Sequence, residues 1–169
     1  GVQTCALPIL ITHHHQDHTG GVDTLVKKSQ AKVLAPRSTP LPYCDQRVKD
    51  QDQFTIESHQ LHFTVLETPG HTLDHVCYFT PGHLFCGDTL FAGGCGRLFE
   101  GDAATMAKSL AKISALPKDT LIYCAHEYTQ NNLRFALAVD PNNQELQQRI
   151  KLVNTQRQRH QPTLPCSLN

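Results

Sequence analysis

Short apolar runs and amphipathic segments alternate along the chain. Short runs of apolar or alternating residues predict β-strands at 9–12, 32–35, 54–56, 61–66, 76–79, 84–86 and 120–124. Apolar residues repeating on one helical face predict helices at 22–28, 106–116, 131–139 and 144–160. Three prolines among polar residues predict a surface loop at 36–52, and nothing after residue 160 predicts a further element. The interleaved strands and helices indicate a layered α/β domain.

Length and composition limit the classes of protein that fit. The 169 residues suit one domain, and 15 basic residues balance 15 acidic ones. This neutral balance argues against a nucleic-acid partner. No apolar run approaches the roughly 20 residues of a transmembrane helix, so we expect no membrane partner. The seven cysteines form no Cys-x-x-Cys pair, which is typical of reduced thiols in a cytoplasmic protein. We expect a monomer.

Both ends of the chain have unusual features. The sequence starts with Gly1, and its only methionine is Met106. Because Pro8 would interrupt a central strand, we expect residues 1–8 to be a non-native segment. We expect residues 9–129 to form the catalytic core. Residues 130–169 are predicted to begin a C-terminal helical region that is cut short.

A dense histidine cluster is the first chemical signal. The run Thr-His-His-His-Gln-Asp-His spans residues 12–18 and directly follows a predicted strand. On an extended backbone His13 and His15 point to one side and His14 to the other. Asp17 and His18 then follow in a turn. Imidazole and carboxylate are common ligands of zinc and similar divalent metals. The alternative is a surface histidine tract or tag remnant, but this run is interrupted by Asp17 and followed by Thr-Gly-Gly.

Three later residues extend the pattern. His71, Asp88 and His126 each follow a predicted strand. Alone, each fits an ordinary structural polar group, but seven donor residues at successive strand ends suit two metal ions. We expect His75 to lie behind the ligands and to orient one by a hydrogen bond. The remaining histidines later in the chain are expected on the surface or in structural roles: His59, His62, His83 and His160.

These motifs resemble those of the metallo-β-lactamase superfamily. The resemblance rests on Thr-His-x-His-x-Asp-His at 12–18, Pro-Gly-His at 69–71, Gly-Asp-Thr at 87–89 and Ala-His-Glu-Tyr at 125–128. Residues 85–91, 93–101 and 125–129 are similar to the glyoxalase II (hydroxyacylglutathione hydrolase) family within it. The resemblance implies an αββα sandwich, here incomplete because the N-terminal strands and most of the C-terminal helical domain are missing.

The resemblance also implies metal ligands and cofactors. One ion would be held by His13, His15 and His71. The other would be held by Asp17, His18 and His126. Asp88 would bridge the two. The implied cofactors are two divalent ions, Zn²⁺ first and iron or manganese as alternatives.

Substrate contacts follow from the same resemblance. Arg97 and Tyr128 would contact the glutathione moiety of the substrate. Phe99 would belong to the same substrate site, although it stands where some relatives carry tyrosine. Asp74 stands where relatives commonly have glycine, and so it adds a charge beside the first ion's ligands.

The donor set itself indicates metal-assisted hydrolysis. Two divalent ions about 3.5–4 Å apart can share a hydroxide, and metal binding brings the pKa of water to about 7. We assign Asp88 and Asp17 as catalytic, with Asp88 positioning the ions and the hydroxide. With the resemblance, this predicts hydrolysis of an S-(2-hydroxyacyl)glutathione, such as S-D-lactoylglutathione. The products are glutathione and a 2-hydroxy acid, in the detoxification of methylglyoxal.

Several alternatives stay open from the sequence. Arg97 also fits a solvated loop charge, and Tyr128 also fits core packing. Cys95 lies in a glycine-rich loop without a neighbouring base and is expected to be structural. A persulfide dioxygenase with one iron would share the fold, as would a lactonase or a phosphodiesterase. A metal-binding fragment without catalytic activity is the alternative from another class.

Overall fold

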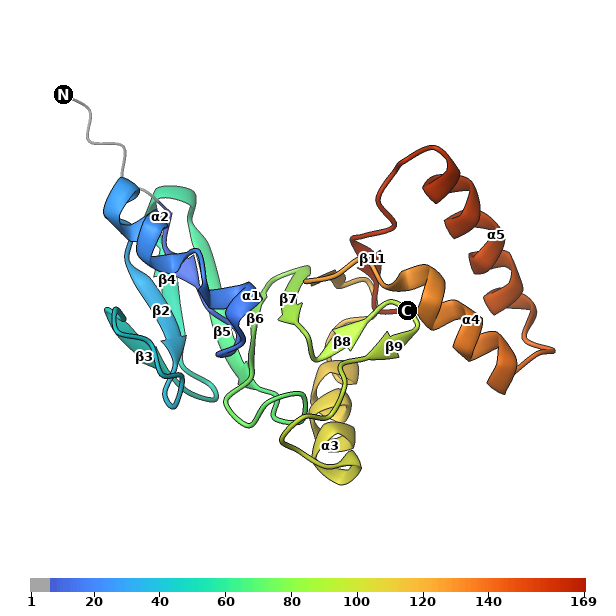
Figure 1. Ribbon diagram of the computed structural model, residues 1–169, viewed down its shortest axis with the longest axis horizontal. Helices are drawn as coiled ribbons and strands as arrows, with labels where there is room; N and C mark the ends of the chain where they lie inside the picture. The colour runs from blue at the N-terminus through green and yellow to red at the C-terminus, as the bar shows by residue number, and fades with distance from the viewer. Residues whose placement is uncertain (1–6) are drawn as a thin grey trace.

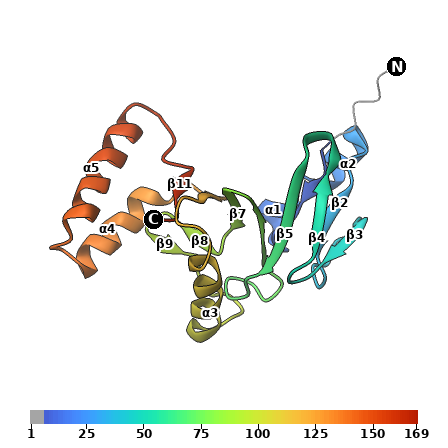
Figure 2. The ribbon, with the colours of Figure 1, turned by 180° about the vertical axis from the view of Figure 1, so that it is seen from behind.

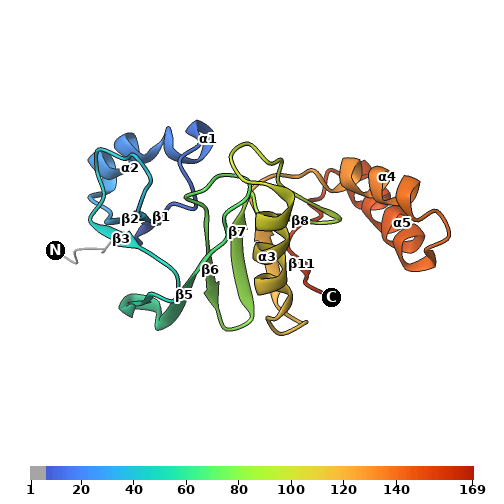
Figure 3. The same ribbon diagram turned by 90° about the horizontal axis from the view of Figure 1, so that it is seen from below.

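The computed structural model describes residues 7–169, and two β-sheets pack face to face in it (Figures 1 and 3). The first sheet is parallel and has the order β1 (Ile9–Leu10), β2 (Val33–Pro36) and β3 (Gln46–Val48). The second has the order β11 (Cys166–Ser167), β10 (Leu121–Cys124), β7 (His83–Gly87), β6 (Val76–Thr80), β5 (Leu61–Glu67) and β4 (Gln53–Ile56). Its neighbours are antiparallel except β7 and β10, which are parallel.

The remaining elements cover or extend the sheets. They are α1 (Gln16–Thr19), α2 (Val22–Ser29), the 3₁₀ turn Glu57–His59, the hairpin β8 (Leu90–Phe91) and β9 (Gly94–Cys95), α3 (Ala103–Ser114), α4 (Thr129–Val139) and α5 (Gln144–Gln158). Figures 1 and 2 show α4 and α5 side by side at the β10–β11 end, away from the first sheet. Figure 3 shows α3 lying along the outer face of the second sheet.

Three apolar clusters define four layers. Val33 and Ala35 point from β2 towards α2, whereas Leu34 points to the second sheet. Burying a Val or Leu side chain contributes about 1.5–3 kcal/mol, so β2 stabilises both of its interfaces. On the other side of the second sheet, Cys77 and Leu84 pack against α3. The order helix, sheet, sheet, helix confirms the predicted αββα fold class.

The sequence of α3 explains why it begins and packs as it does. The Asp102 carboxylate accepts a hydrogen bond of 2.7 Å from the backbone N–H of Thr105 and caps the helix. Met106, Ser109 and Ile113 recur at helical spacing and form its buried face. The helix starts three residues before the predicted 106–116 segment, because the cap lies outside the apolar pattern.

Two expectations about secondary structure were wrong. The predicted loop at 36–52 contains β3, which pairs in parallel with β2 and buries Val48. A three-residue strand with one buried side chain is too short for a periodic signal. The last residues are not without an element either, because β11 pairs with β10 at the sheet edge. Both strands depend on partners distant in sequence.

The described part of the expected non-native segment is limited to Leu7 and Pro8, since residues 1–6 lie outside the described residues. β1 begins directly after Pro8. Within residues 7–169, none of the helices is both long enough and apolar enough to span a bilayer.

Candidate metal centre

The seven predicted donor residues come from five places in the chain and lie together. His13 and His15 occupy the segment between β1 and α1. Asp17 and His18 belong to the short helix α1, where a turn was predicted. The other three follow strands β5, β7 and β10: His71, Asp88 and His126. The ends of strands from the second sheet thus meet the segment that follows β1.

The first predicted set is closely spaced. One nitrogen from each of His13, His15 and His71 lies within 4.8 Å of the other two. His71 Nε2 is 3.0 Å from His15 Nδ1. Ligands about 2.0–2.2 Å from a tetrahedral ion lie roughly 3.3–3.6 Å from one another, so this spacing suits a shared ion.

The second predicted set is equally compact but more accessible. His126 Nε2 lies 3.3 Å from Asp17 Oδ2, and His18 Nε2 lies 3.5 Å from the same oxygen. The Asp17 side chain is 59% exposed, whereas that of His18 is 13% exposed. This side of the cluster therefore opens to solvent.

Asp88 lies between the two sets. Its Oδ1 is 3.4 Å from His18 Nε2. Its Oδ2 is 3.5 Å from His71 Nε2 and 3.4 Å from His126 Nε2. One buried carboxylate thus faces donors of both sets, as a bridging ligand must.

Unpartnered polar atoms test whether the cluster fits metal ions. Three buried side-chain atoms of the cluster have no hydrogen-bond partner: His13 Nε2, His18 Nε2 and Asp88 Oδ1. Leaving such an atom unsatisfied costs about 1–3 kcal/mol. All three carry electron pairs that bind divalent metals. The donor set therefore fits a metal centre better than a network held by hydrogen bonds alone.

The surroundings favour the neutral form of two imidazoles of the cluster, those of His13 and His18. Burial, and then the neighbouring His75 ring, drive the pKa of His13 far below its ordinary value. Burial likewise lowers the pKa of His18, although Asp88 and Asp17 oppose the shift. His71 Nδ1 donates to the Arg97 carbonyl at 2.7 Å, which leaves Nε2 free to bind a metal.

We expected His75 to orient a metal ligand by a hydrogen bond to its side chain. The hydrogen bonds that the His75 ring makes within residues 7–169 go instead to the Asp88 backbone and to two threonine hydroxyls. Its Nε2 accepts from the Asp88 backbone N–H at 3.1 Å. Its Nδ1 lies 3.1 Å from the Thr68 hydroxyl and 3.0 Å from the Thr89 hydroxyl. Burial lowers the pKa of His75 to about 3. A neutral His75 therefore fixes the backbone that carries Asp88.

Glycine residues allow the close approach of these loops. Gly87 has φ +49°, and a Cβ there would lie 2.7 Å from the Thr12 hydroxyl oxygen. At Gly96 a Cβ would lie 1.8 Å from the Asp88 carbonyl oxygen and 3.1 Å from His71 Nδ1. The glycine-rich segment was predicted as a loop, but its packing against Asp88 gave no sequence signal.

We expect Gly96→Ala to disturb the cluster and to destabilise the protein. The clash involves a backbone atom, so the loop must move away from Asp88 and His71. Overpacking of this kind costs about 1–3 kcal/mol. Zinc content and thermal unfolding measure both effects. Gly21→Ala is the matched control, since a Cβ there would first meet Leu25 at 4.0 Å. Unchanged zinc content in Gly96→Ala would contradict this prediction.

The predicted substrate residues flank the cluster. The Phe99 ring is 59% exposed and packs edge-on against His15 and His71, with centroids 5.4 and 5.3 Å away. On the other side, Tyr128 stacks on His126 at 5.0 Å. The Arg97 guanidinium lies 5.3 Å from the Phe99 ring centroid. Two exposed aromatic rings and one arginine thus surround the opening.

The contact that holds the His126 loop has no signal in the sequence. The Glu127 carboxylate accepts hydrogen bonds from the backbone N–H of Thr163, at 2.8 Å, and from the Thr163 hydroxyl. Burial raises the pKa of Glu127, but these bonds outweigh it and lower the pKa overall. The segment after α5 therefore fixes the loop that carries His126 and Tyr128.

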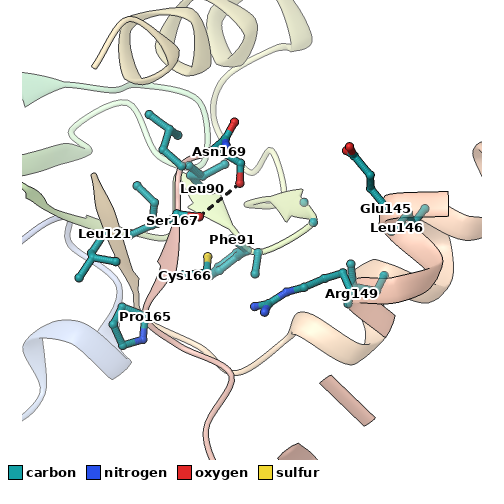
Figure 4. Close-up of a pocket in the computed structure, with 16 residues that line it drawn as sticks. Leu90, Phe91, Leu121, Glu145, Leu146, Arg149, Pro165, Cys166, Ser167 and Asn169 are labelled. Carbon is teal, nitrogen blue, oxygen red and sulfur yellow. Dashed lines mark hydrogen bonds between the residues drawn. The ribbon is translucent and has the colours of Figure 1, made fainter. Parts of the chain in front are cut away.

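A large cavity lies elsewhere, away from the cluster. It has a volume of about 820 Å³ and is lined by residues of β8, β10, β11 and α5. Figure 4 shows Arg149 extending from α5 into the space beside Phe91 and Cys166. None of the seven donor residues lines it.

Comparison with known families places the chain. Residues 9–126 match the sequence model of the metallo-beta-lactamase superfamily, which is more than half of the chain. The chain therefore belongs to this superfamily, as the fold and the cluster indicate. Residues 127–169 match the model described as the hydroxyacylglutathione hydrolase C-terminus.

Individual relatives agree with this placement. The hydroxyacylglutathione hydrolase of Aeromonas salmonicida is 54% identical over 162 residues, which cover 95% of this chain and 63% of that protein. The chain thus spans less than two thirds of this relative. The crystal structure of BLEG-1 B3 metallo-beta-lactamase has a TM-score of 0.62 and 30% identity, covering 73% of this chain and 71% of that one. TTHA1623 in a di-iron-bound form has a TM-score of 0.60 and 28% identity, covering 70% and 69%.

Proposed function

We propose that the chain carries the metal centre of a hydroxyacylglutathione hydrolase. The reaction is hydrolysis of an S-(2-hydroxyacyl)glutathione thioester, such as S-D-lactoylglutathione, in methylglyoxal detoxification. The observation that carries the proposal is the position of Asp88, whose two oxygens face donors of both sets. The match of residues 127–169 to the hydrolase C-terminus and the identity to named hydrolases support the substrate class.

In this proposal the seven donors hold two divalent ions. His13, His15 and His71 hold the first. Asp17, His18 and His126 hold the second, and Asp88 bridges both. TTHA1623, whose structure is similar, has been crystallised in a di-iron-bound form, which supports a two-metal centre. Zn²⁺ is our first candidate, with iron or manganese as alternatives, because His/Asp sites accept all three.

The chain's own residues then position the reactants. Two bound divalent ions would supply an activated water and would polarise the thioester carbonyl. Asp17 is the accessible carboxylate of the cluster, and we propose that the oxygen it does not use to hold its ion accepts a proton from the attacking water. Attack on the carbonyl carbon breaks the C–S bond, and the departing sulfur takes up the proton. Phe99 and Tyr128 form the walls that hold the substrate over the cluster.

Thioester turnover tests this proposal directly. The chain loaded with Zn²⁺ should hydrolyse S-D-lactoylglutathione, lose the activity with a chelator and regain it with metal. A persulfide dioxygenase would instead consume dioxygen with glutathione persulfide. Metal binding without turnover of either substrate would leave the chain a metal-binding fragment. A metal analysis that finds two bound ions per chain would favour the hydrolase over the one-iron alternative.

The proposed setting of the reaction follows from composition. We propose a cytoplasmic monomer that acts on a small molecule, without a nucleic-acid or membrane partner. Balanced charge supports the absence of nucleic acid. The described cysteines from Cys44 onwards are free thiols, which suits a reducing compartment.

We expect Arg97→Ala to raise KM for the glutathione thioester. The arginine would pair with a carboxylate remote from the thioester, in the ground state and the transition state alike. A hydrogen bond to a charged group contributes about 1.5–3 kcal/mol, which is roughly 10–100-fold in kcat/KM. A small thioester without the glutathione tail should be hydrolysed as before. Arg37→Ala, at another exposed arginine, is the control, and equal losses for both substrates would contradict the carboxylate contact.

A further inference from the structure

His14, which lies between His13 and His15 in the chain, directs its ring to two carboxylates and not to the metal centre. His14 Nδ1 lies 2.9 Å from Asp74 Oδ1, and His14 Nε2 lies 3.2 Å from Glu100 Oε1. Carboxylate oxygens only accept hydrogen bonds, so His14 Nδ1 is the donor to Asp74. The ring is thus held between two carboxylates on different loops.

Asp74 is the buried member of this arrangement. The residue is 8% exposed, and its carboxylate accepts from His14, from the Thr72 hydroxyl at 2.7 Å and from the Thr39 hydroxyl. Burial raises the pKa of Asp74, but the bonds from Thr39, Thr72 and His14 outweigh it and lower the pKa overall. Asp74 is therefore a fully partnered carboxylate and does not disturb the loop it occupies.

These contacts join four separate loops. Thr39 follows β2, and His14 belongs to the segment that carries His13 and His15. Asp74 lies on the same loop as His71. Glu100 lies on the loop of Arg97 and Phe99, and it also accepts from the Leu73 backbone N–H at 2.7 Å. These contacts link the segment that carries His13 and His15 to the loop that carries His71.

We propose that Asp74 is a positioning residue that acts through His14 to hold the first donor set, His13, His15 and His71, in place for its metal ion. The inference rests on the ligand assignment of the proposed function and is independent of its substrate.

The local backbone explains why such a residue is needed. Residues 11–15 lie in neither a helix nor a strand. Backbone–backbone hydrogen bonds hold Ile11 and Thr12, but within residues 7–169 none of them involves His13 or His14. Ordering a free backbone costs entropy for each residue, and a binding site must repay that cost at each binding event unless it is already ordered. His14 lies between His13 and His15 in the chain, so fixing its ring restricts the backbone that carries both donors.

Zinc affinity measured without substrate tests the inference. Asp74→Asn keeps the shape of the side chain but removes its charge and one acceptor. We expect zinc binding at one site to weaken about tenfold, the lower end of the effect of losing a partner bonded directly to a metal ligand, because Asp74 acts through His14. Competition with a chromophoric chelator measures it. Asp23→Asn, an exposed aspartate of α2, is the matched control and should bind zinc as the wild type does.

Two backgrounds show which site is affected. In His126→Ala, which impairs the second set, Asp74→Asn should still weaken the remaining site. In His71→Ala, which impairs the first set, it should have no further effect. A residue that only stabilises the fold would weaken both sites equally and would lower the unfolding temperature of the metal-free protein without this selectivity. Equal weakening in both backgrounds would therefore overturn the proposal.

A double-mutant cycle tests whether Asp74 acts through His14. If Asp74 acts through His14, Asp74→Asn should cause little further loss in a His14→Gln background. Should Asp74→Asn fail to fold, Thr39→Val removes one donor to the carboxylate and should give a smaller loss at the same site. Zinc affinity within about twofold of wild type for the folded variants, well below the expected outer-partner effect, would overturn the proposal. Failure of thioester hydrolysis would leave these measurements unchanged.

Discussion

Asp88→Asn is expected to abolish most of the thioesterase activity of the metal-loaded chain. The carboxylate lies 3.4–3.5 Å from His18, His71 and His126, and so it faces both donor sets. The amide keeps its shape but loses the charge and one of the two acceptor oxygens. A partner behind a ligand typically contributes about 10–100-fold, so a bridging ligand should cost more than about 100-fold in kcat.

Metal content and activity should fall together in this variant. Elemental analysis after dialysis gives the number of ions per chain, and a thioester assay gives kcat. His75→Ala should cost less, because His75 contacts the Asp88 backbone and not an ion. Asp119→Asn, at an exposed aspartate, is the matched control. Equal losses in Asp88→Asn and His75→Ala would mean that Asp88 is not a bridging ligand.

Acid should destabilise the metal-free protein well above the pH at which carboxylates titrate. The pKa of His75 is about 3 in the folded state, whereas an unfolded histidine has a pKa of about 6.5. Between these values the unfolded chain binds more protons, so stability is complete above about pH 6.5 and declines as the pH falls towards 3. His13 behaves in the same way, because burial also drives its pKa far down.

The size of this effect follows from the shift at each site. A pH of 5.0 lies about 1.5 units below the pKa of an unfolded histidine. Each histidine that stays neutral in the folded state therefore lowers the free energy of unfolding by about 2 kcal/mol at that pH. His13 and His75 together should therefore lower the free energy of unfolding by about 4 kcal/mol between pH 7.5 and 5.0. Urea unfolding at a series of pH values measures the slope. His75→Gln should remove about half of it, with the exposed His62→Gln as control. If the free energy of unfolding of His75→Gln kept the full wild-type dependence on pH, the proton uptake would belong to other residues.

Much of the fold could be predicted because its elements carry local signals. The hairpin of β4 and β5 and the pair β6 and β7 have alternating apolar residues, and both were expected within a residue or two. The strands that sequence missed have only a few residues each. Val48 in β3 and Cys166 in β11 gain their place from pairing with β2 and β10. Such pairing depends on segments distant in sequence and leaves no periodic pattern.

The amino-acid sequence is enough to identify the donor residues and to place them after strands. Residue type, position after predicted strands and the family resemblance together predicted that His71, Asp88 and His126 join the histidine run. How the donors are held depends on the packing of the folded chain. His75 bonds to the Asp88 backbone, the Arg97 carbonyl orients His71, and Asp74 holds His14. These contacts span 13–60 positions. They arise only when loops from different strands are packed together, because hydrogen-bond partners across loops are selected by distance in space and not by spacing along the chain.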